Sequence, residues 1–137
     1  GDGDELWYCS NRGASPRRLE PGLYGLSNHQ LDTPWPKVVR AKQALADLLT
    51  RPGFDREKAL AILADTTRAA DQDLPETGIP LAWERALSAA FIVKDVYGTR
   101  CSTLLASSNE GRHLLVERRF QGLPDTWQES EFTWQAT

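Results

Sequence analysis

The apolar residues of this chain change their spacing along the sequence, and this change limits the possible fold class more than any other feature. In the middle of the chain they recur every three or four positions, which is the period of one helix face. At residues 100–106 and 112–120 they alternate, which is the period of a strand with one buried face. Strands followed by helices and then by a meander of strands are typical of an α+β domain, with an antiparallel sheet and packed helices.

The first predicted helix covers residues 34–49. Asp32 or Thr33 suits the N-cap, and Pro34 suits the first helical position, where its missing N–H is not needed. One apolar stripe follows at helical spacing, formed by Val38, Ala41, Leu45 and Leu48. We expect this stripe to pack on the sheet.

Two more helices are predicted after it. Residues 55–65 form the second helix, and Asp55 suits its N-cap. Pro80 precedes a short third helix over residues 81–90. The side chains of the third segment that we expect to point inward are Leu81, Leu87 and Phe91.

Strands are predicted at both ends of the chain. Residues 5–11 and 22–27 form the first two strands, joined by a loop at 12–16. Near the C-terminus, a hairpin loop at 107–111 joins the two alternating segments, and residues 129–134 form the last strand.

The segment 112–120 carries both apolar and charged side chains. Leu114, Val116 and Phe120 share one face, as expected of a half-buried strand. The charged residues on this strand are Glu117, Arg118 and Arg119, and we interpret them as protection of a sheet edge.

Composition excludes several functional classes. The formal net charge is −3, whereas a duplex-binding domain usually carries a basic excess, so we expect no nucleic-acid partner. No apolar run approaches the roughly 18 residues that cross a bilayer, so no transmembrane segment is expected. Cys9 and Cys101 are too few for a disulfide framework and lie in predicted strands, so we expect buried, inert thiols in a cytoplasmic protein. Since His29 and His113 are the only histidines, no metal site is predicted.

The chain reads as a single unit over residues 1–137, because it contains no internal repeat and no linker. Residues 1–4 have turn chemistry and are followed at once by a strand, which favours a hairpin whose first arm lies upstream. The alternative is a native start from which the Met before Gly1 has been removed. Under the first interpretation the chain is the C-terminal part of a larger domain.

Several strings of this sequence together resemble one known family. Residues 22–28 read GLYGLSN, residues 31–38 read LDTPWPKV, residues 97–105 read YGTRCSTLL and residues 117–120 read ERRF. With a lead-in at residues 5–12, they are similar to the C-terminal half of the NRDE family, the family of the transport and Golgi organisation protein 2. The Asn-Arg-Asp-Glu string that names the family, and the Cys that follows its initiator Met, are absent from this sequence.

The resemblance implies the C-terminal half of an N-terminal-nucleophile-hydrolase-like αββα sandwich, in which two antiparallel sheets pack between helical layers. That chemistry needs a nucleophilic side chain on the first residue, whose α-amino group serves as the base. Gly1 has no side chain, so we expect no catalytic residue in this chain. The roles that the resemblance implies are haem mobilisation and a part in lipid and membrane homeostasis.

Three functions from different classes remain open. The first is a ligand-handling module for haem or another amphipathic small molecule, with haem as a transported ligand and no required cofactor. The second is a cysteine-type amidohydrolase whose nucleophile lies in the missing N-terminal half. The third is a structural fragment without activity of its own. We expect the chain to associate with its missing N-terminal half or with itself, for instance through the strand at 5–11.

The candidate ligand contacts gather at the end of the strand predicted at 22–27. Asn28 stands where related cysteine amidases carry an asparagine that donates to the oxyanion, and the alternative is an Asx-type turn. Ser27 precedes it, and Trp35 between two prolines is either a ligand contact or a core or lid aromatic. The N-terminus of the helix that follows adds a positive dipole end, which suits an anionic group.

The remaining candidates lie elsewhere in the sequence. Arg100 suits a clamp on a carboxylate such as a haem propionate, or else a pair with a strand or loop carboxylate. His29 and His113 are the only histidine candidates for haem iron, and a solvated or hydrogen-bonded surface position is the alternative for each.

Overall fold

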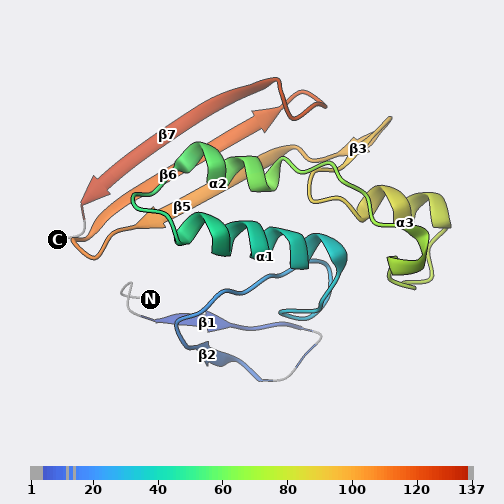
Figure 1. Ribbon diagram of the computed structural model, residues 1–137, viewed down its shortest axis with the longest axis horizontal. Helices are drawn as coiled ribbons and strands as arrows, with labels where there is room; N and C mark the ends of the chain where they lie inside the picture. Colours follow the sequence, from blue (N-terminus) through green and yellow to red (C-terminus); the bar gives the residue numbers. More distant parts are fainter. Residues whose placement is uncertain (1–4, 12, 14, 136–137) are drawn as a thin grey trace.

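The structure of the protein, a computed structural model, describes residues 5–11, 13 and 15–135. The turn expected at residues 1–4 and two positions of the expected 12–16 loop lie outside the described residues. The described part is α+β, with three α-helices and antiparallel sheets (Figure 1). The fold class predicted from the hydrophobic period is therefore confirmed at this level.

Three antiparallel strands form the main sheet, in the order β5-β6-β7. Their bounds are Cys101–Ser107 for β5, Arg112–Phe120 for β6 and Trp127–Gln135 for β7. Leu104 of β5 lies opposite Val116 of β6, which in turn lies opposite Glu131 of β7. The alternating pattern therefore predicted three real strands, each with ends close to those expected.

Helices α1 (Pro36–Leu49) and α2 (Arg56–Leu63) run side by side along one face of this sheet (Figure 1). Helix α2 packs on β5, and Arg118 on the inward face of β6 bonds to Glu57 of α2; on the same face of β6, Val116 is fully buried. The Phe91 and Phe120 rings pack edge to face with centroids 4.7 Å apart, an arrangement that aromatic pairs favour. The apolar core consists of Val38, Leu48, Ala59, Leu60, Ala86, Ala89, Phe91, Val116 and Phe120.

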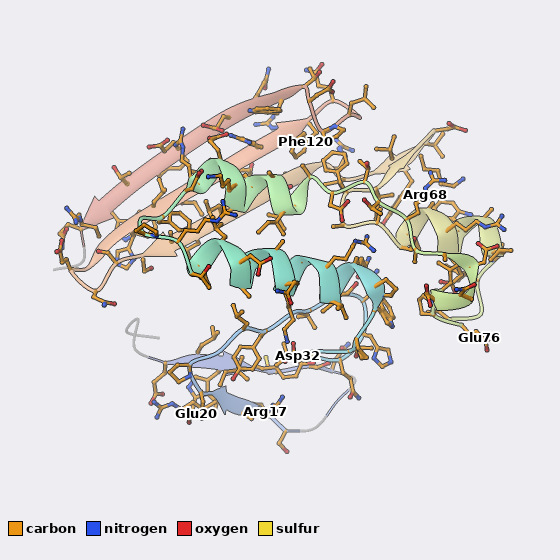
Figure 2. The ribbon with its side chains drawn as sticks, in the orientation of Figure 1. Arg17, Glu20, Asp32, Arg68, Glu76 and Phe120 are labelled. Carbon is orange, nitrogen blue, oxygen red and sulfur yellow. The ribbon has the colours of Figure 1, made fainter. Side chains whose placement is uncertain are left out.

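The helix starts differ in how well the sequence predicted them. The Asp55 side chain caps α2 by accepting a hydrogen bond from Lys58 N at 3.1 Å, as predicted. In α1 the N-cap is Trp35 and Pro36 takes the first position, so the predicted start at Asp32 to Pro34 is wrong. The reason is that the Asp32 carboxylate accepts from Gly25 N and Lys42 Nζ, on the side of α1 that faces the N-terminal segment of the chain (Figure 2).

Helix α3 (Leu81–Leu87) ends before the predicted boundary at residue 90. Leu81 is 50% exposed, so the expectation that it points inward is wrong, whereas Phe91 is fully buried as expected. A short ribbon follows, formed by β3 (Val93–Lys94) and β4 (Tyr97–Gly98). This ribbon could not be predicted from the sequence, because two-residue strands are too short to show a period.

The N-terminal segment forms a ribbon of β1 (Leu6–Tyr8) and β2 (Arg17–Leu19). The first predicted strand is therefore real but shorter than expected. The strand predicted at 22–27 is wrong, since this segment is irregular. Its backbone is held by a local contact, in which Gly25 bonds to Asp32 instead of to a neighbouring strand.

Both cysteine side chains are exposed, so the expectation of buried thiols is wrong. Cys9 follows the end of β1, and Cys101 begins β5 on the face opposite Ser102, which is buried. A strand has two faces, and residue type alone did not indicate which face the helices would cover.

Arg118 is the buried charge of the main sheet. Because β6 is the central strand, its charged residues do not protect an edge, and that interpretation is wrong. The Arg118 guanidinium donates to Glu57 Oε2 of α2 at 2.6 Å and to Glu129 Oε2 of β7 at 2.7 Å. It also lies 4.4 Å from the centroid of the Trp127 ring. This one side chain therefore connects α2 to two strands of the sheet.

We expect Arg118→Ala to lower the free energy of unfolding by about 2 kcal/mol, because two carboxylates would lose the buried cation between them. Arg119→Ala is the matched control, since Arg119 is exposed on the other face and has no ion pair among the described residues. It should change the free energy by about 0.5 kcal/mol or less. Urea unfolding followed by tryptophan fluorescence measures both, and equal losses would contradict the role assigned to Arg118.

Candidate functional site

The segment before α1 forms a closed loop around Asp32. Gly25 N donates to Asp32 Oδ1 at 2.8 Å, and Asp32 N donates to Gly25 O at 2.7 Å. Lys42 of α1 adds an ion pair of 2.6 Å to the same carboxylate oxygen. The hydrogen bond from Lys42, followed by that from Gly25, lowers the pKa of the Asp32 carboxyl from its ordinary value. The loop closed in this way carries Asn28 and His29.

Two residues of this loop have little freedom to change. A Cβ on Gly25 would lie 2.5 Å from Val38 Cγ1, so α1 approaches the backbone too closely for any larger residue. Asp32 has a φ of 60°, a left-handed conformation that Asp and Asn tolerate better than most residues. Gly25 and Asp32 therefore determine where the loop lies against α1.

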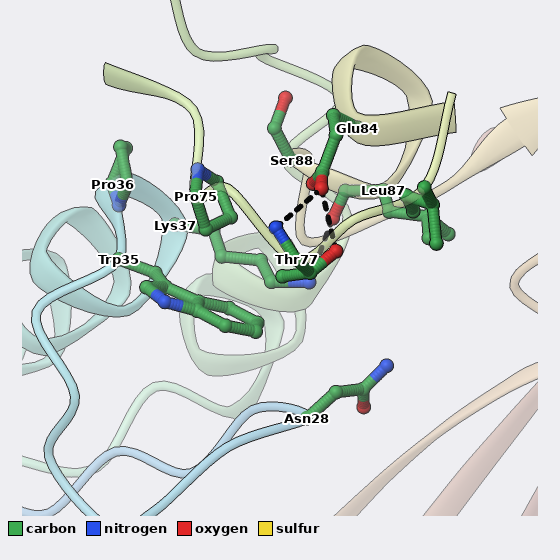
Figure 3. Close-up of a pocket in the computed structure, with 10 residues that line it drawn as sticks. Asn28, Trp35, Pro36, Lys37, Pro75, Thr77, Glu84, Leu87 and Ser88 are labelled. Atoms are coloured by element: carbon green, nitrogen blue, oxygen red, sulfur yellow. Dashed lines mark hydrogen bonds between the residues drawn. The ribbon is translucent and has the colours of Figure 1, made fainter. Parts of the chain in front are cut away.

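A cavity of about 310 Å³ lies beside this loop, between the N-terminus of α1 and helix α3 (Figure 3). Its volume is at the lower end of the range typical of small-molecule sites. The apolar part of its wall consists of Trp35, Pro36, Pro75, Ile79 and Leu87. Polar side chains complete the lining, and two of them carry opposite charges.

Lys37 supplies the positive charge of the cavity. It is half-buried, and its Nζ donates to Leu87 O at 2.8 Å. The ammonium also lies 5.9 Å from the centroid of the Trp35 ring. Burial lowers the pKa of the Lys37 ammonium, because removal from water disfavours the charged form. The first turn of α1 contains no acidic residue, so the positive end of the helix dipole adds to this charge.

Glu84 supplies the negative charge and is only 7% exposed. Its Oε1 accepts hydrogen bonds from Thr77 N at 2.9 Å and from Thr77 Oγ1 at 2.5 Å (Figure 3). No cation of the described residues forms a salt bridge with it within 4.0 Å. The carboxylate is therefore held by the loop that covers α3, and not by an ion pair.

The structure brings together two of the four predicted ligand contacts. Asn28 and Trp35 line the same cavity. The Asn28 side chain makes no hydrogen bond to another described residue, so the Asx turn weighed for it is not observed. Ser27 lines neighbouring hollows instead, and Arg100 is exposed just before β5, outside this cavity. Arg100 forms no ion pair in the described part of the chain, and the ligand roles of all four residues stay predictions.

The two histidines lie in different places. The His29 ring is 5.8 Å from Trp35, and its Nδ1 is hydrogen-bonded to Thr33 Oγ1 at 2.8 Å. His113 stacks on Trp134 with centroids 5.0 Å apart, on the face of the sheet away from the helices. Only His29 therefore lies next to a side chain that lines the cavity.

Sequence reasoning did not single out Lys37 or Glu84. A signal for Lys37 was present, because a lysine in the first turn of a helix is unfavourable next to the dipole unless something else requires it. Glu84 carried no signal, since a glutamate in a short helix normally faces water.

Two negative findings apply to the described residues. No cluster of three or more His, Cys, Asp and Glu side chains among them could hold a metal ion. Within the same residues, no helix combines the length and the apolar character that crossing a bilayer requires.

We expect Asp32→Ala to loosen the loop and lower the midpoint of urea unfolding, because Gly25 N and Lys42 would lose their acceptor. Asp32→Asn is the control, since Asn tolerates the left-handed conformation and keeps an acceptor oxygen. Hydrogen exchange over residues 25–32, followed by mass spectrometry, should be faster in Asp32→Ala than in Asp32→Asn. The same exchange rates in both variants would contradict the closure of the loop by this carboxylate.

Comparison with known proteins adds the family. The family model described as Transport and Golgi organisation 2 matches residues 1–122. The Transport and Golgi organization protein 2 homolog of Bos taurus is 32% identical over 136 residues, covering 92% of this chain and 49% of the relative. The homologs of Homo sapiens, 32% identical over 127 residues, and Mus musculus, 30% over 125, each cover 85% of this chain and 45% of the relative.

The chain thus spans about half the length of the curated relatives that it matches. The resemblance seen in residues 22–38 and 97–105 is confirmed by a match that includes both strings. The chain belongs to the Transport and Golgi organisation 2 family.

Proposed function

We propose that this chain provides a binding site for a small amphipathic molecule, in the cavity between the N-terminus of α1 and α3. The observation that carries the proposal is an apolar wall beside the half-buried ammonium of Lys37. The apolar part of a ligand would leave water against Trp35 and Leu87, which contributes about 25 cal/mol per Å² of buried apolar area. An anionic group on the same ligand would accept hydrogen bonds from Lys37 and from the amide of Asn28.

In the full-length protein, we propose that this site takes part in handling an amphipathic cargo, with haem as one candidate. The propionates of haem are carboxylates, for which Lys37 at the cavity and Arg100 outside it are suitable partners. His29 uses its Nδ1 to contact Thr33, so its Nε2 is left as a possible ligand of the iron. The proposal of haem handling rests on the family resemblance, and the proposal of a cytoplasmic location rests on the low cysteine count.

A second candidate is an amidohydrolase whose nucleophile comes from outside this chain. The observation that favours it is the side-chain amide of Asn28 at the cavity, because an oxyanion needs N–H donors that are already in place. Binding ranks first, since Lys37 and the apolar wall require no group beyond the described residues. If the cavity binds nothing, the purely structural role becomes the preferred one.

We also propose that a second layer covers the outer face of the main sheet in the full-length protein. Leu105, Phe132 and Trp134 project from that face and are 61%, 61% and 47% exposed. Exposed apolar surface on a sheet is usually buried against another layer. The occupant that we propose is the N-terminal half of the family sequence, which would complete the αββα sandwich. Where that half is absent, we expect self-association through the same face.

The binding of 3-phenylpropionate, an amphipathic carboxylate, tests the cavity. Lys37→Met should weaken its affinity about tenfold, because a charged hydrogen bond is lost from a half-buried position. Lys58→Met is the control, since Lys58 pairs with Asp55 on the surface. The indole N–H signal of Trp35 in NMR titrations reports binding.

The same titration has a pH dependence with a definite sign. Because burial lowers the pKa of Lys37, the affinity for the carboxylate should fall as the pH rises, and the fall should begin below the ordinary lysine pKa of about 10.4. A wild-type cavity that takes up neither 3-phenylpropionate nor its amino-bearing analogue L-phenylalanine at pH 7 would contradict the proposed function.

Haem binding has its own test. If the cavity takes part in haem handling, His29→Ala should abolish the sharpened, red-shifted Soret band that distinguishes histidine-bound haem from free haem, because the histidine beside Trp35 is lost. His113→Ala should keep the band, since His113 lies on the outer face of the sheet, stacked on Trp134. A band that survives both substitutions would show that no histidine of this chain holds the iron.

A further inference from the structure

We propose that the cavity selects a zwitterionic ligand, a compact apolar molecule that carries both a carboxylate and an ammonium group. The ligand's carboxylate binds the ammonium of Lys37, and the ligand's ammonium binds the carboxylate of Glu84. This inference rests on the proposed function of the same cavity, and it names the class of ligand that the cavity takes.

The burial of Glu84 is the first step of the argument. A glutamate that is 7% exposed normally has a cation beside it, because moving a carboxylate out of water is unfavourable unless its charge is compensated. Glu84 accepts only from Thr77, through Oε1 in both hydrogen bonds. Its Oε2 has no hydrogen-bond donor among the described residues, and because no buried side-chain oxygen of these residues lacks a partner, this oxygen has accessible surface from which it can accept a hydrogen bond from a ligand.

Lys37 supplies the second charge. Its Nζ donates one hydrogen bond to Leu87 O at 2.8 Å, so two of the three N–H groups are left. Lys42 and Lys58 each pair with a carboxylate, at 2.6 and 2.8 Å, whereas Lys37 pairs with no carboxylate of the described residues. The α1 N-terminus provides no acidic side chain to balance it.

The two charges face one cavity without neutralising each other. Lys37 and Glu84 both line it (Figure 3), and no salt bridge within 4.0 Å joins them. A ligand with a carboxylate alone leaves Glu84 without a cation, and a ligand with an ammonium alone meets a like charge at Lys37. A zwitterion compensates both groups, and its apolar part lies against Trp35 and Ile79.

The experiment compares three probes that share one phenyl ring. L-phenylalanine carries both charged groups, 3-phenylpropionate lacks the ammonium, and phenethylamine lacks the carboxylate. Each is titrated into the purified protein at pH 7, with the Trp35 indole N–H signal as the readout. We expect L-phenylalanine to bind about tenfold more tightly than either of the other two probes, because each of its charges meets an opposite charge.

Two substitutions assign the effect to the named residues. Glu84→Gln keeps an acceptor for Thr77 but removes the charge. It should therefore lower the affinity for L-phenylalanine about tenfold without lowering the affinity for 3-phenylpropionate. Lys37→Met should lower the affinity for both probes that carry a carboxylate, and it should not lower the affinity for phenethylamine. Lys58→Met and Glu110→Gln are the controls, because they alter exposed ion pairs outside the cavity.

A further variant separates the charge of Glu84 from its role in holding the loop. Thr77→Val removes the hydroxyl that donates to Glu84 but leaves the carboxylate, so the preference for L-phenylalanine over 3-phenylpropionate should persist. Loss of that preference in Thr77→Val, with Glu84→Gln no different from the wild type, would show that the loop and not the charge selects the ligand. This result would overturn the proposal.

The remaining outcomes distinguish this inference from the function on which it rests. If 3-phenylpropionate binds as tightly as L-phenylalanine and Glu84→Gln alters neither, the zwitterion proposal is wrong and an amphipathic carboxylate site remains. If none of the three probes shifts the Trp35 signal, both proposals are overturned.

Discussion

The burial of the inward face of β6 is the constraint on which the rest of the structure depends. Val116 is fully buried in the middle of the sheet. One position along this face, Arg118 joins α2 through Glu57, and at the end of the strand Phe120 packs against Phe91. Alternate residues of β6 thus hold together helix α2, the neighbouring strands β5 and β7, and the segment after α3. Without this face the helices would have no surface on which to bury their apolar stripes.

The candidate site is a consequence of that packing at one end of the helix layer. Asp65, just after α2, accepts from Arg40 of α1 at 3.1 Å and from the backbone N–H of Phe91 at 2.8 Å. These contacts hold the segment that precedes α3 in the sequence and the segment that follows it close to α1. The hydrogen bond from Lys37 to Leu87 O then spans 50 residues of sequence. The cavity therefore lies where two helix ends meet, and no single segment contains it.

How much of the fold could be predicted depended on how regular each segment is. Residues 112–120 alternate over nine positions, and β6 has the predicted bounds. Residues 22–27 have strand-forming residue types, but the bonds between Gly25 and Asp32 hold them in an irregular loop. Residue preferences at helix ends do not detect a contact between two particular residues either, and because Asp32 bonds to Gly25 and Lys42, the N-cap expected at Asp32 or Thr33 placed the start of α1 too early.

The candidate site was only partly predictable for a related reason. Asn28 and Trp35 are only seven positions apart in the sequence, so they could be expected in one place even though the helix start predicted between them is wrong. Glu84 comes from a helix far along the chain, and its burial depends on the loop that carries Thr77. The packing of helices and strands decides which charged side chains are paired or buried. Residue type alone therefore did not predict the burial of Glu84.

The sequence by itself determined the fold class, the helical middle, the C-terminal meander and the family. These follow from local spacing and from strings such as residues 22–28, because the period of side chains along a helix or strand is a property of neighbouring positions. Only the tertiary structure decided that β6 is central, that Arg118 is buried and that Lys37 and Glu84 line one cavity. Each of these three features requires contact between residues that are distant in sequence. The packing of whole helices and strands determines such contacts, whereas the order of residues within one helix or strand does not.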